Sequence, residues 1–472
     1  MSDHEFVKSQ RGRNLLHKEG YIYVRDRITA DTIYWKCEQY KSGCKGRVIE
    51  KGPLVKTKGS HDHAGTPEKL ETRKVLQAIR QKSRTSVEPP QAIISEATAS
   101  TSEVTRTHLP SISSMKRTIR NIRIKENDFP SVPISRNELV LPEKFKLTPK
   151  GEKFLLFDSG ADDDDEEEPR FLMFGTEENL RLLSISQYWF ADGTFKTVPH
   201  FFHQLYTVHG KVGEIVVPLI YILLPNKQRV TYVRSLRHLK ECILSFGNVS
   251  LRKIVMTDFE VSLISVVKEV FPDAKHYGCF FHFKQCLYRK ISNLGLKKKY
   301  DSDPEFQRKV KLLEALAFVP VNFVERSFNI ILEQNILPVQ MQNFVDYFED
   351  TWIGKFERRT RNPPMFPYTM WSCYSNIIHE MPVTNNIVEG WNRGFLSQMR
   401  SEKPSVWSFL DTIQREQTTT ELKITRERTG ERMLKKKYKN LNTRLQNVCS
   451  EFDELYSDDE IEQYLRRISL II

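Results

Sequence analysis

An acidic residue inside an apolar run is the feature that most constrains how this 472-residue chain can fold. Asp192 lies within Trp189–Phe195, between apolar runs at 182–190 and 201–208 that are predicted to be buried strands. An ionised carboxylate is costly to bury unless a cation or a metal pairs with it. Because aspartate before glycine is also a common turn signal, a local turn remains the alternative.

Two later segments favour a metal site over a turn. The β-branched segment 252–258 ends in Asp258, and residues 383–393 place Glu389 one turn into a helix that Asn385 or Asn386 can cap. Mg²⁺ prefers oxygen ligands and keeps several waters, so a few carboxylates suffice to bind it. Two such ions can hold the attacking and leaving oxygens of a phosphoryl transfer. The three acids therefore predict a site for Mg²⁺ or Mn²⁺.

Four further residues near these acids are candidates for a supporting role. Asn392 shares a helix face with Glu389, and Arg393 follows it, so either could approach a phosphate. A cap and a surface pair are the alternative. Cys279 and His282 could begin a zinc site with Cys286, Cys373 or His379, although two ligands do not complete one. His282 could instead position DNA or move a proton, and Cys279 could simply pack in the core.

A second candidate metal site lies near the N-terminus. Six residues separate Cys37 from Cys44, and His61 and His63 follow within a span of 27 residues. Two cysteines and two histidines can complete a tetrahedral zinc shell, which would supply much of the folding energy of so small a domain. The alternative is a surface loop beside two unrelated cysteines. Basic residues near the predicted ligands are candidates for DNA phosphate contacts: Lys36, Lys41, Lys45 and Arg47.

Most of the net charge of +12 sits in the first quarter of the chain, where residues 1–130 hold 25 Lys and Arg against 15 Asp and Glu. Such a surplus suggests nucleic acid as a partner, with solubility as the alternative. Within this region, segments 67–82, 90–97 and 110–123 are predicted helices. The last has Ile112, Met115, Ile119 and Ile122 on one side and Lys116, Arg117, Arg120 and Arg123 largely on the other. That basic side could sit on DNA, or it could be a solvated face.

The rest of the chain alternates strand-like and helix-like segments. An extended connector is predicted at 127–150 and a solvated acidic loop at 162–168. The basic run 435–439 is a candidate nuclear-import patch. The order strand, strand, strand, helix, strand, helix, strand is predicted from Trp189, in segments 189–195, 204–208, 213–224, 228–246, 254–258, 261–270 and 274–280. A mixed α/β sheet follows from this order, and residues 283–379 are predicted to be helical.

Several of these motifs resemble known families. About residues 153–400 resemble the core of the Mutator-like element (MULE) transposases. Four motifs show the resemblance: Asp192–Phe195, Thr257–Asp258, Cys279–His282 and Asn385–Glu389. The resemblance implies an α/β ribonuclease-H-like fold with a helical insertion at about 283–380. It also implies that Asp192, Asp258 and Glu389 form an acidic triad, with the Cys-x-x-His element near the active site.

Residues 12–65 resemble the FLYWCH zinc finger in their Cys/His spacing and in Trp35, two residues before Cys37. The predicted organisation is therefore a zinc finger at 12–65 and a basic helical segment at 66–126. After these come a connector at 127–152, the transposase-like core at 153–400 and a helical C-terminal region at 401–472.

These observations leave two functions open. One is a DNA transposase that binds double-stranded DNA in the nucleus, contains zinc and Mg²⁺ or Mn²⁺, and acts as a homo-oligomer. The other is a non-enzymatic DNA-binding regulator derived from such a transposase, and the intact acidic triad favours the first. No apolar stretch approaches the roughly 20 residues of a membrane span, so no membrane partner is expected. The seven cysteines are sparse and odd in number, which argues against a disulfide scaffold.

Overall fold

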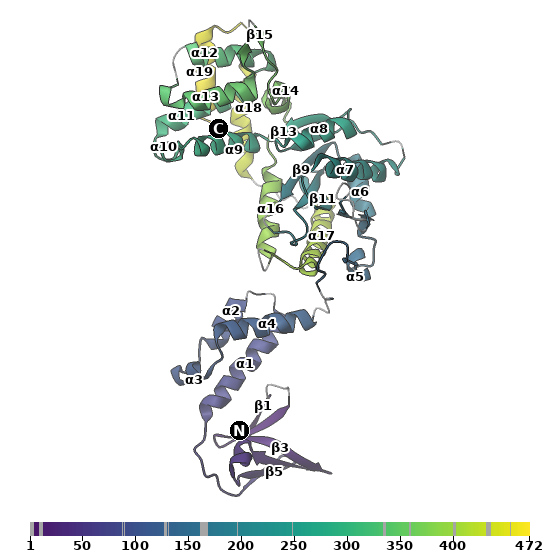
Figure 1. Ribbon diagram of the computed structural model, residues 1–472, viewed down its shortest axis with the longest axis vertical. Helices are drawn as coiled ribbons and strands as arrows, with labels where there is room; N and C mark the ends of the chain where they lie inside the picture. The colour runs from purple at the N-terminus through teal and green to yellow at the C-terminus, as the bar shows by residue number, and fades with distance from the viewer. Residues whose placement is uncertain are drawn as a thin grey trace. The chain divides into compact units, whose positions relative to one another are not determined.

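The computed structural model describes residues 4–8, 13–86, 88, 90–126, 130, 132–160, 169–195, 197–247, 249–333, 337–357, 360–399, 403–430, 436–453 and 455–472. The chain divides into two compact units, Met1–Ser131 and Val132–Ile472, which are described separately (Figure 1). The acidic run 162–168 lies outside the described residues. Lys435 and the side chains of the rest of the basic run 435–439 do so too.

A six-stranded antiparallel sheet opens the first unit. Its strands follow chain order: β1 (His4–Lys8), β2 (Asn14–Lys18), β3 (Tyr21–Thr29), β4 (Thr32–Cys37), β5 (Arg47–Lys51) and β6 (Leu54–Lys58). Strand β3 pairs with β4, with Tyr23 opposite Cys37. Strand β1 was not predicted. Its Phe6 pairs with Leu16 and packs 5.9 Å from the Trp35 ring, so the sheet begins before residue 12.

Four helices complete the first unit: α1 (Pro67–Thr85), α2 (Pro90–Thr98), α3 (Glu103–His108) and α4 (Ile112–Glu126). Their apolar faces meet in one cluster of Val75, Ile79, Ile93, Ile94, Met115 and Ile119. The short helix α3 was not predicted. It begins at Ser102, whose side chain accepts a hydrogen bond from the backbone N–H of Thr105.

The predicted two-sidedness of α4 is wrong at both of its ends. Ile112 is exposed, whereas Arg123 is buried. The guanidinium of Arg123 donates to the backbone oxygens of Ser86 and Glu88, at 2.8 and 2.7 Å. These carbonyls follow the end of α1, where no helical N–H is left to bond them. Arg123 therefore holds α4 against α1 and is not part of a free basic face.

A seven-stranded mixed sheet forms the centre of the second unit, in the order β13-β12-β9-β10-β11-β8-β7. Its strands are β7 (Leu155–Asp158), β8 (Leu172–Phe174), β9 (Tyr188–Thr194), β10 (Gln204–Val212), β11 (Ile215–Leu224), β12 (Ile254–Thr257) and β13 (Lys275–Gly278). The helices α6 (Glu177–Ile185), α7 (Arg229–Leu244) and α8 (Val261–Val270) pack with it (Figure 1). The predicted element order from Trp189 is thus observed.

One local prediction about this sheet is wrong, and one alternative is excluded. The first half of the apolar run 182–190 belongs to helix α6 and not to a strand, because Thr176 caps that helix by accepting from the N–H of Asn179. In addition, Asp192 and Gly193 form no turn. Both lie inside β9 and pair with β10, Asp192 opposite Thr207 and Gly193 opposite Tyr206.

The remainder of the second unit is largely helical. A short α5 (Glu143–Lys146) precedes the sheet, and after it come α9 (Phe280–Asn293), α10 (Lys297–Ser302), α11 (Pro304–Ala315), α12 (Val324–Glu333), α13 (Gln342–Phe348), α14 (Tyr368–Trp371) and α15 (Tyr374–Ile378), with a small hairpin of β14 (Phe356–Glu357) and β15 (Thr360–Arg361). Then follow α16 (Asn386–Gln398), α17 (Val406–Arg428), α18 (Lys436–Ser450) and α19 (Asp458–Ser469).

The helical core of the second unit combines residues 280–383 with the C-terminal helices α18 and α19, which α16 and α17 separate from them in sequence. Helix α17 packs on β11, whereas α19 packs on α11 and α12. Tyr464 of α19 is buried and donates to the backbone oxygen of Phe318. The predicted insertion at 283–380 therefore shares one core with the C-terminal helices. Among the described residues, no helix is both long and apolar enough to cross a membrane.

Candidate metal sites

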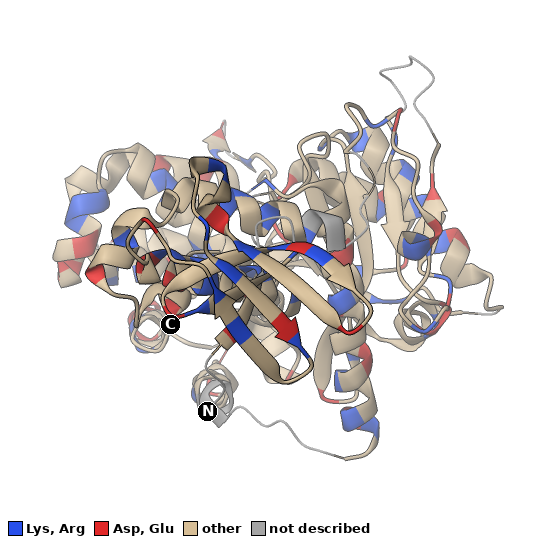
Figure 2. Cartoon of the chain, turned by 90° about the horizontal axis from the view of Figure 1, so that it is seen from below, with Lys and Arg blue, Asp and Glu red and all other residues tan. Residues whose placement is uncertain are grey.

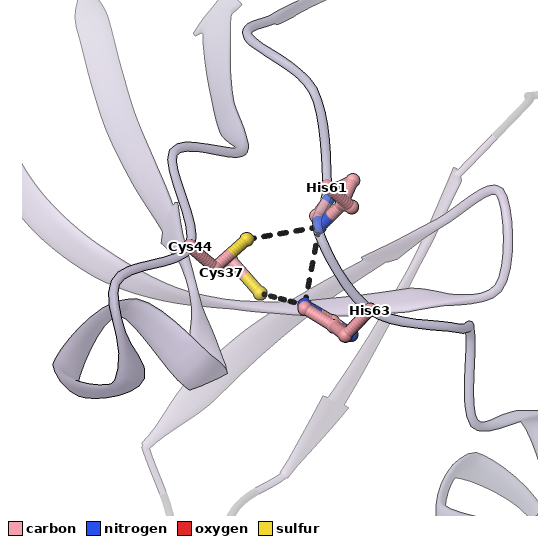
Figure 3. A group of neighbouring side chains, drawn as sticks. All are labelled: Cys37, Cys44, His61 and His63. Carbon is pink, nitrogen blue, oxygen red and sulfur yellow. Dashed lines mark hydrogen bonds between the residues drawn. The ribbon is translucent and has the colours of Figure 1, made fainter.

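The two cysteines and two histidines of the first unit meet at one point (Figure 3). Cys37 ends β4, Cys44 follows a short 3₁₀ helix, and His61 and His63 lie beyond β6. Cys37 Sγ is 3.3 Å from His63 Nε2, Cys44 Sγ is 3.3 Å from His61 Nδ1, and the two histidine nitrogens are 3.4 Å apart. A tetrahedral zinc ion holds its S and N ligands roughly 3.4–3.8 Å from one another, so the spacing suits zinc.

The remaining ring nitrogens of both histidines have hydrogen-bond partners. His61 Nε2 lies 2.8 Å from the hydroxyl of Tyr23, and His63 Nδ1 lies 2.9 Å from the backbone oxygen of Ala64. Tyr21 also stacks on His61 with ring centroids 3.6 Å apart. Outer partners of this kind fix the tautomer and orientation of a metal-binding imidazole.

Backbone geometry around the cysteines completes the cluster. The N–H of Gln39 donates to Cys37 Sγ and the N–H of Gly46 donates to Cys44 Sγ, both at 3.4 Å. Such bonds stabilise negative charge on sulfur. A Cβ at Gly46 would lie 2.3 Å from a ring carbon of His61, so only glycine fits there.

The acidic residues of the second unit gather at one end of its sheet. Strand β9 runs parallel to β12, and the register that pairs Tyr188 with Ile254 brings Asp192 level with Asp258. Strand β13 is parallel to β12 in turn, and His282 lies in the first turn of the helix that follows it. The carboxyl ends of parallel strands meet at one edge of a sheet, which is a common place for ligand sites.

Helix α16 brings Glu389 and Asn392 to the same edge. Glu389 Oε1 lies 3.1 Å from His282 Nε2, and Asn392 Nδ2 donates to Asp192 Oδ2 at 2.7 Å. Ligand atoms of Asp192, His282 and Glu389 lie within 4.8 Å of one another, whereas Asp258 is not in this group. The predicted neighbour Arg393 is exposed.

Cys279 attaches α16 to the sheet. Its thiol donates to Asn385 Oδ1 at 2.8 Å and its sulfur accepts from the N–H of Asn385 at 3.3 Å. Cys279 also packs with Phe190, Met256 and Val388. Among the described residues, Cys279 is in no group that could hold a metal, so packing accounts for it better than the zinc site considered with Cys286, Cys373 and His379.

The electrostatics of this edge depend on burial and on close charges. Burial raises the pKa of Asp192 to about 7; His282 opposes this rise, whereas Glu389 and Asp258 add to it. Burial lowers the pKa of His282, but Cys279, Glu389 and Asp192 outweigh it and raise the pKa to about 10. Without a metal, therefore, a protonated His282 compensates the charge of the acids.

Comparison with known families assigns the segment of the Cys/His cluster and the segment of Asp192, Asp258 and His282, whereas Glu389 lies beyond the second match. Residues 6–63 match the model of the FLYWCH zinc finger domain, and residues 188–286 match that of the MULE transposase domain. The chain contains a FLYWCH zinc finger and a MULE transposase domain. The finger match begins at residue 6, before the predicted start at 12, and so includes part of strand β1, which pairs with β2. With the Cys/His cluster, it supports zinc as a constituent of the finger.

Two curated relatives match a short part of this chain. The human protein "FLYWCH-type zinc finger-containing protein 1" is 35% identical over 71 residues, which are 15% of this chain and 10% of that protein. The mouse protein of the same name is 37% identical over 60 residues, which are 12% of this chain and 9% of that protein. The chain thus spans about a tenth of the length of these relatives.

The basic residues predicted to contact DNA fall into two groups. Lys36 pairs with Asp26 at 2.8 Å, and Arg47 donates to the backbone oxygens of Cys44 and Gly46, so both brace the FLYWCH finger. Lys41 and Lys45 are exposed and, among the described residues, pair with no carboxylate. Figure 2 shows basic residues spread over the strands of the finger, with acidic ones between them.

The three predicted residues of α4 form a contiguous group. Arg117 and Arg120 are exposed on the side of α4 away from buried Met115 and Ile119, and half-buried Lys116 flanks them four residues before Arg120. None of the three pairs with a carboxylate in the part of the chain that the structure describes. Their charges are therefore available to a partner.

Proposed function

We propose that the protein is a DNA-binding, transposase-like enzyme that cuts and joins phosphodiesters at the edge formed by Asp192, Asp258 and Glu389. The observation that carries this proposal is the convergence of Asp192 and Glu389, which lie far apart in the sequence and whose ligand atoms lie within 4.8 Å of one another. Asp192 lies in the segment that matches the MULE transposase domain. The sheet order, with parallel β9, β12 and β13 and antiparallel β10 and β11, supports a ribonuclease-H-like core.

The residues at this edge suit divalent cations. Carboxylates at close range repel one another unless positive charge lies between them, and Asp192 is buried beside Glu389. Two Mg²⁺ or Mn²⁺ ions, when bound, would lower the barrier by stabilising charge on the attacking and leaving oxygens. Asn392 restrains Asp192 by its hydrogen bond, and the Cys279–Asn385 contact fixes the start of the helix that carries Glu389.

The proposed reaction has two displacements at phosphorus. A water oxygen bonds to phosphorus while the bond to the 3′ oxygen breaks, leaving a 3′ hydroxyl and a 5′ phosphate. That hydroxyl then bonds to the phosphorus of a second phosphodiester and displaces its 3′ oxygen.

DNA binding is proposed to lie in the first unit. The exposed Lys41 and Lys45 of the finger and the free basic side of α4, Lys116, Arg117 and Arg120, are suited to phosphate contacts. Cys37, Cys44, His61 and His63 are the proposed zinc ligands that keep the finger folded. A nuclear location follows from a function on DNA.

Strand cleavage by the purified full-length protein tests the proposal. The substrate is duplex DNA carrying the terminal inverted repeats that flank the gene, with Mg²⁺ in one reaction and Ca²⁺ in its control. Asp192→Asn, Asp258→Asn and Glu389→Gln each remove one negative ligand while keeping the side-chain shape. Each is expected to abolish Mg²⁺-dependent cleavage and to leave DNA binding largely unchanged. Cleavage by any of these variants would overturn the site assignment.

A DNA-binding regulator without catalytic activity is the second candidate. The observation that favours it is that the human and mouse relatives, whose names give a FLYWCH-type zinc finger and no transposase, are 35% and 37% identical to 15% and 12% of this chain. A wild-type protein that binds the terminal repeats but never cuts them would establish this candidate over the first. Absence of terminal repeats beside the gene would point the same way.

A further inference from the structure

The edge of the sheet holds a histidine that the acidic triad does not include. His282 Nε2 lies 3.1 Å from Glu389 Oε1, and both lie with Asp192 inside a 4.8 Å group of candidate ligand atoms. Octahedral ligands about 2.1 Å from a cation lie about 3.0 Å from their neighbours, so the histidine–glutamate separation is that of two adjacent ligands. Asp258, the remaining triad residue, lies outside this group.

A second observation points to a cation at the same place. Asn392 is only 7% exposed, and its Nδ2 is bound to Asp192 Oδ2. Its Oδ1 is buried without a hydrogen-bond partner among the described residues. Buried carbonyl oxygens are rarely left unpaired. Because the amide is held beside Asp192, this oxygen is available to a cation or to a water on that cation.

We propose that Asp192, His282 and Glu389 hold one divalent cation through two carboxylate oxygens and the imidazole Nε2. This inference rests on the proposed function, which requires divalent cations at this edge, and it makes the two cation positions unequal. One position would have a nitrogen ligand, whereas the other, for which Asp192 and Asp258 remain as ligands, would have oxygen ligands only. A nitrogen ligand favours Mn²⁺ over Mg²⁺ at the first position, because imidazole suits transition metals better than it suits Mg²⁺.

The backbone supports this ligand set without rearrangement. His282 is in the first turn of α9, immediately after β13, and Glu389 is in the first turn of α16. The starts of these two helices are joined by the Cys279–Asn385 bonds and by the N–H of Phe280, which donates to the backbone oxygen of Val383 at 3.0 Å. The distance between the two ligands is therefore set by rigid elements and not by a loop.

Pulsed electron paramagnetic resonance of Mn²⁺ bound to the zinc-loaded, full-length protein tests the ligand directly. A coordinated imidazole gives ¹⁴N modulation of the Mn²⁺ echo, and carboxylates do not. We expect this modulation in the wild type and its loss in His282→Gln, together with a fall in Mn²⁺ affinity of at least about tenfold. His379→Gln is the matched control, because His379 is exposed and its Nδ1 bonds only Ser375.

The outcomes separate this inference from the proposed function. Bound Mn²⁺ without ¹⁴N modulation, unchanged binding in His282→Gln, or no Mn²⁺ binding at all would each overturn the ligand set. A protein that cuts DNA but gives no ¹⁴N modulation would support the proposed function and contradict this ligand set. A protein that gives the modulation but never cuts DNA would support the ligand set and contradict the proposed function.

Discussion

At the scale of single residues, Gly46 decides whether the finger can hold its metal. A methyl group on Gly46 would enter the ring of His61, one of the four clustered side chains. We expect Gly46→Ala in the full-length protein to lose most of its zinc, measured by elemental analysis after dialysis. Gly43→Ala is the control, because it meets nothing within 4 Å and adds only backbone strain at its φ of +99°, about 1–2 kcal/mol. Equal zinc content in both variants would contradict the packing argument.

The charge of Asp192 gives a second prediction at this scale. Its pKa rises from 3.8 to about 7 on folding, so the stability linked to its protonation is present below pH 3.8 and is lost as the pH rises towards 7. Asp192→Asn cannot ionise. In metal-free protein, the variant's melting temperature relative to wild type should therefore increase by at least about 2 °C between roughly pH 5 and pH 8.

Thermal melts at the two pH values, with and without Mn²⁺, check this prediction. Mn²⁺ should reduce the difference at the higher pH by stabilising only the wild type, since a ligand that binds the folded state raises its stability. A difference that does not change with pH would mean that Asp192 is ionised at low cost.

The sequence predicted which single residues belong to the two sites, but not which side chains contact one another. Asp192, Glu389 and the four zinc-site side chains stand out by residue type and spacing. The Asn392–Asp192 bond joins residues 200 positions apart and the Cys279–Asn385 bond joins residues 106 apart. No local spacing encodes such pairs, since the topology of the sheet and the rotamers bring them together. The structural role of Arg123 was missed for the same reason.

At the scale of secondary-structure elements, α4 carries a basic side whose effect on DNA binding can be measured. Each lysine or arginine that binds phosphate releases condensed counterions. The variant Lys116→Gln, Arg117→Gln, Arg120→Gln should bind duplex DNA more weakly. The slope of log affinity against log salt is negative, and its magnitude should decrease by roughly two to three. Arg117→Gln alone should lower that magnitude by about one.

The matched single control is Lys69→Gln, an exposed lysine on α1 that lies outside the α4 group. It should leave the slope of the wild type nearly unchanged. Arg123 is unsuitable as a control because its removal would leave the backbone oxygens of Ser86 and Glu88 without their donor. Equal effects of Arg117→Gln and Lys69→Gln would mean that the DNA contact is not specific to α4.

Elements with strong periodic patterns were predicted well, and elements fixed by caps or tertiary pairing were not. Helix α8 was predicted with its observed bounds because apolar residues recur at helical spacing between two strands. Helix α3 has only 6 residues and depends on the Ser102 cap, and strand β1 depends on pairing with β2. In 182–190, an apolar run was divided between helix and strand by the Thr176 cap, which periodicity does not reveal.

At the scale of the whole molecule, the two units have separate cores. The finger packs around Leu16, Tyr23, Trp35 and Val48, and the second unit packs around its sheet and its helical core. The sequence did not indicate that α18 and α19 complete the helical core around 283–380, because contacts between distant segments leave no local pattern. Units with separate cores can unfold independently unless a large interface joins them.

Zinc removal should therefore affect only one of two unfolding transitions. A small finger folds with its metal, so a chelator should lower or abolish a transition of the Met1–Ser131 unit. The Val132–Ile472 unit contains no part of the zinc cluster, so its transition should keep its midpoint. Differential scanning calorimetry of the full-length protein in buffer free of Mg²⁺ and Mn²⁺, with and without chelator, measures both. Cys44→Ala should reproduce the effect of the chelator without one present. Because Cys44 and its three partners lie within the first unit, a chelator-induced shift of every transition together would mean that the two units unfold as one.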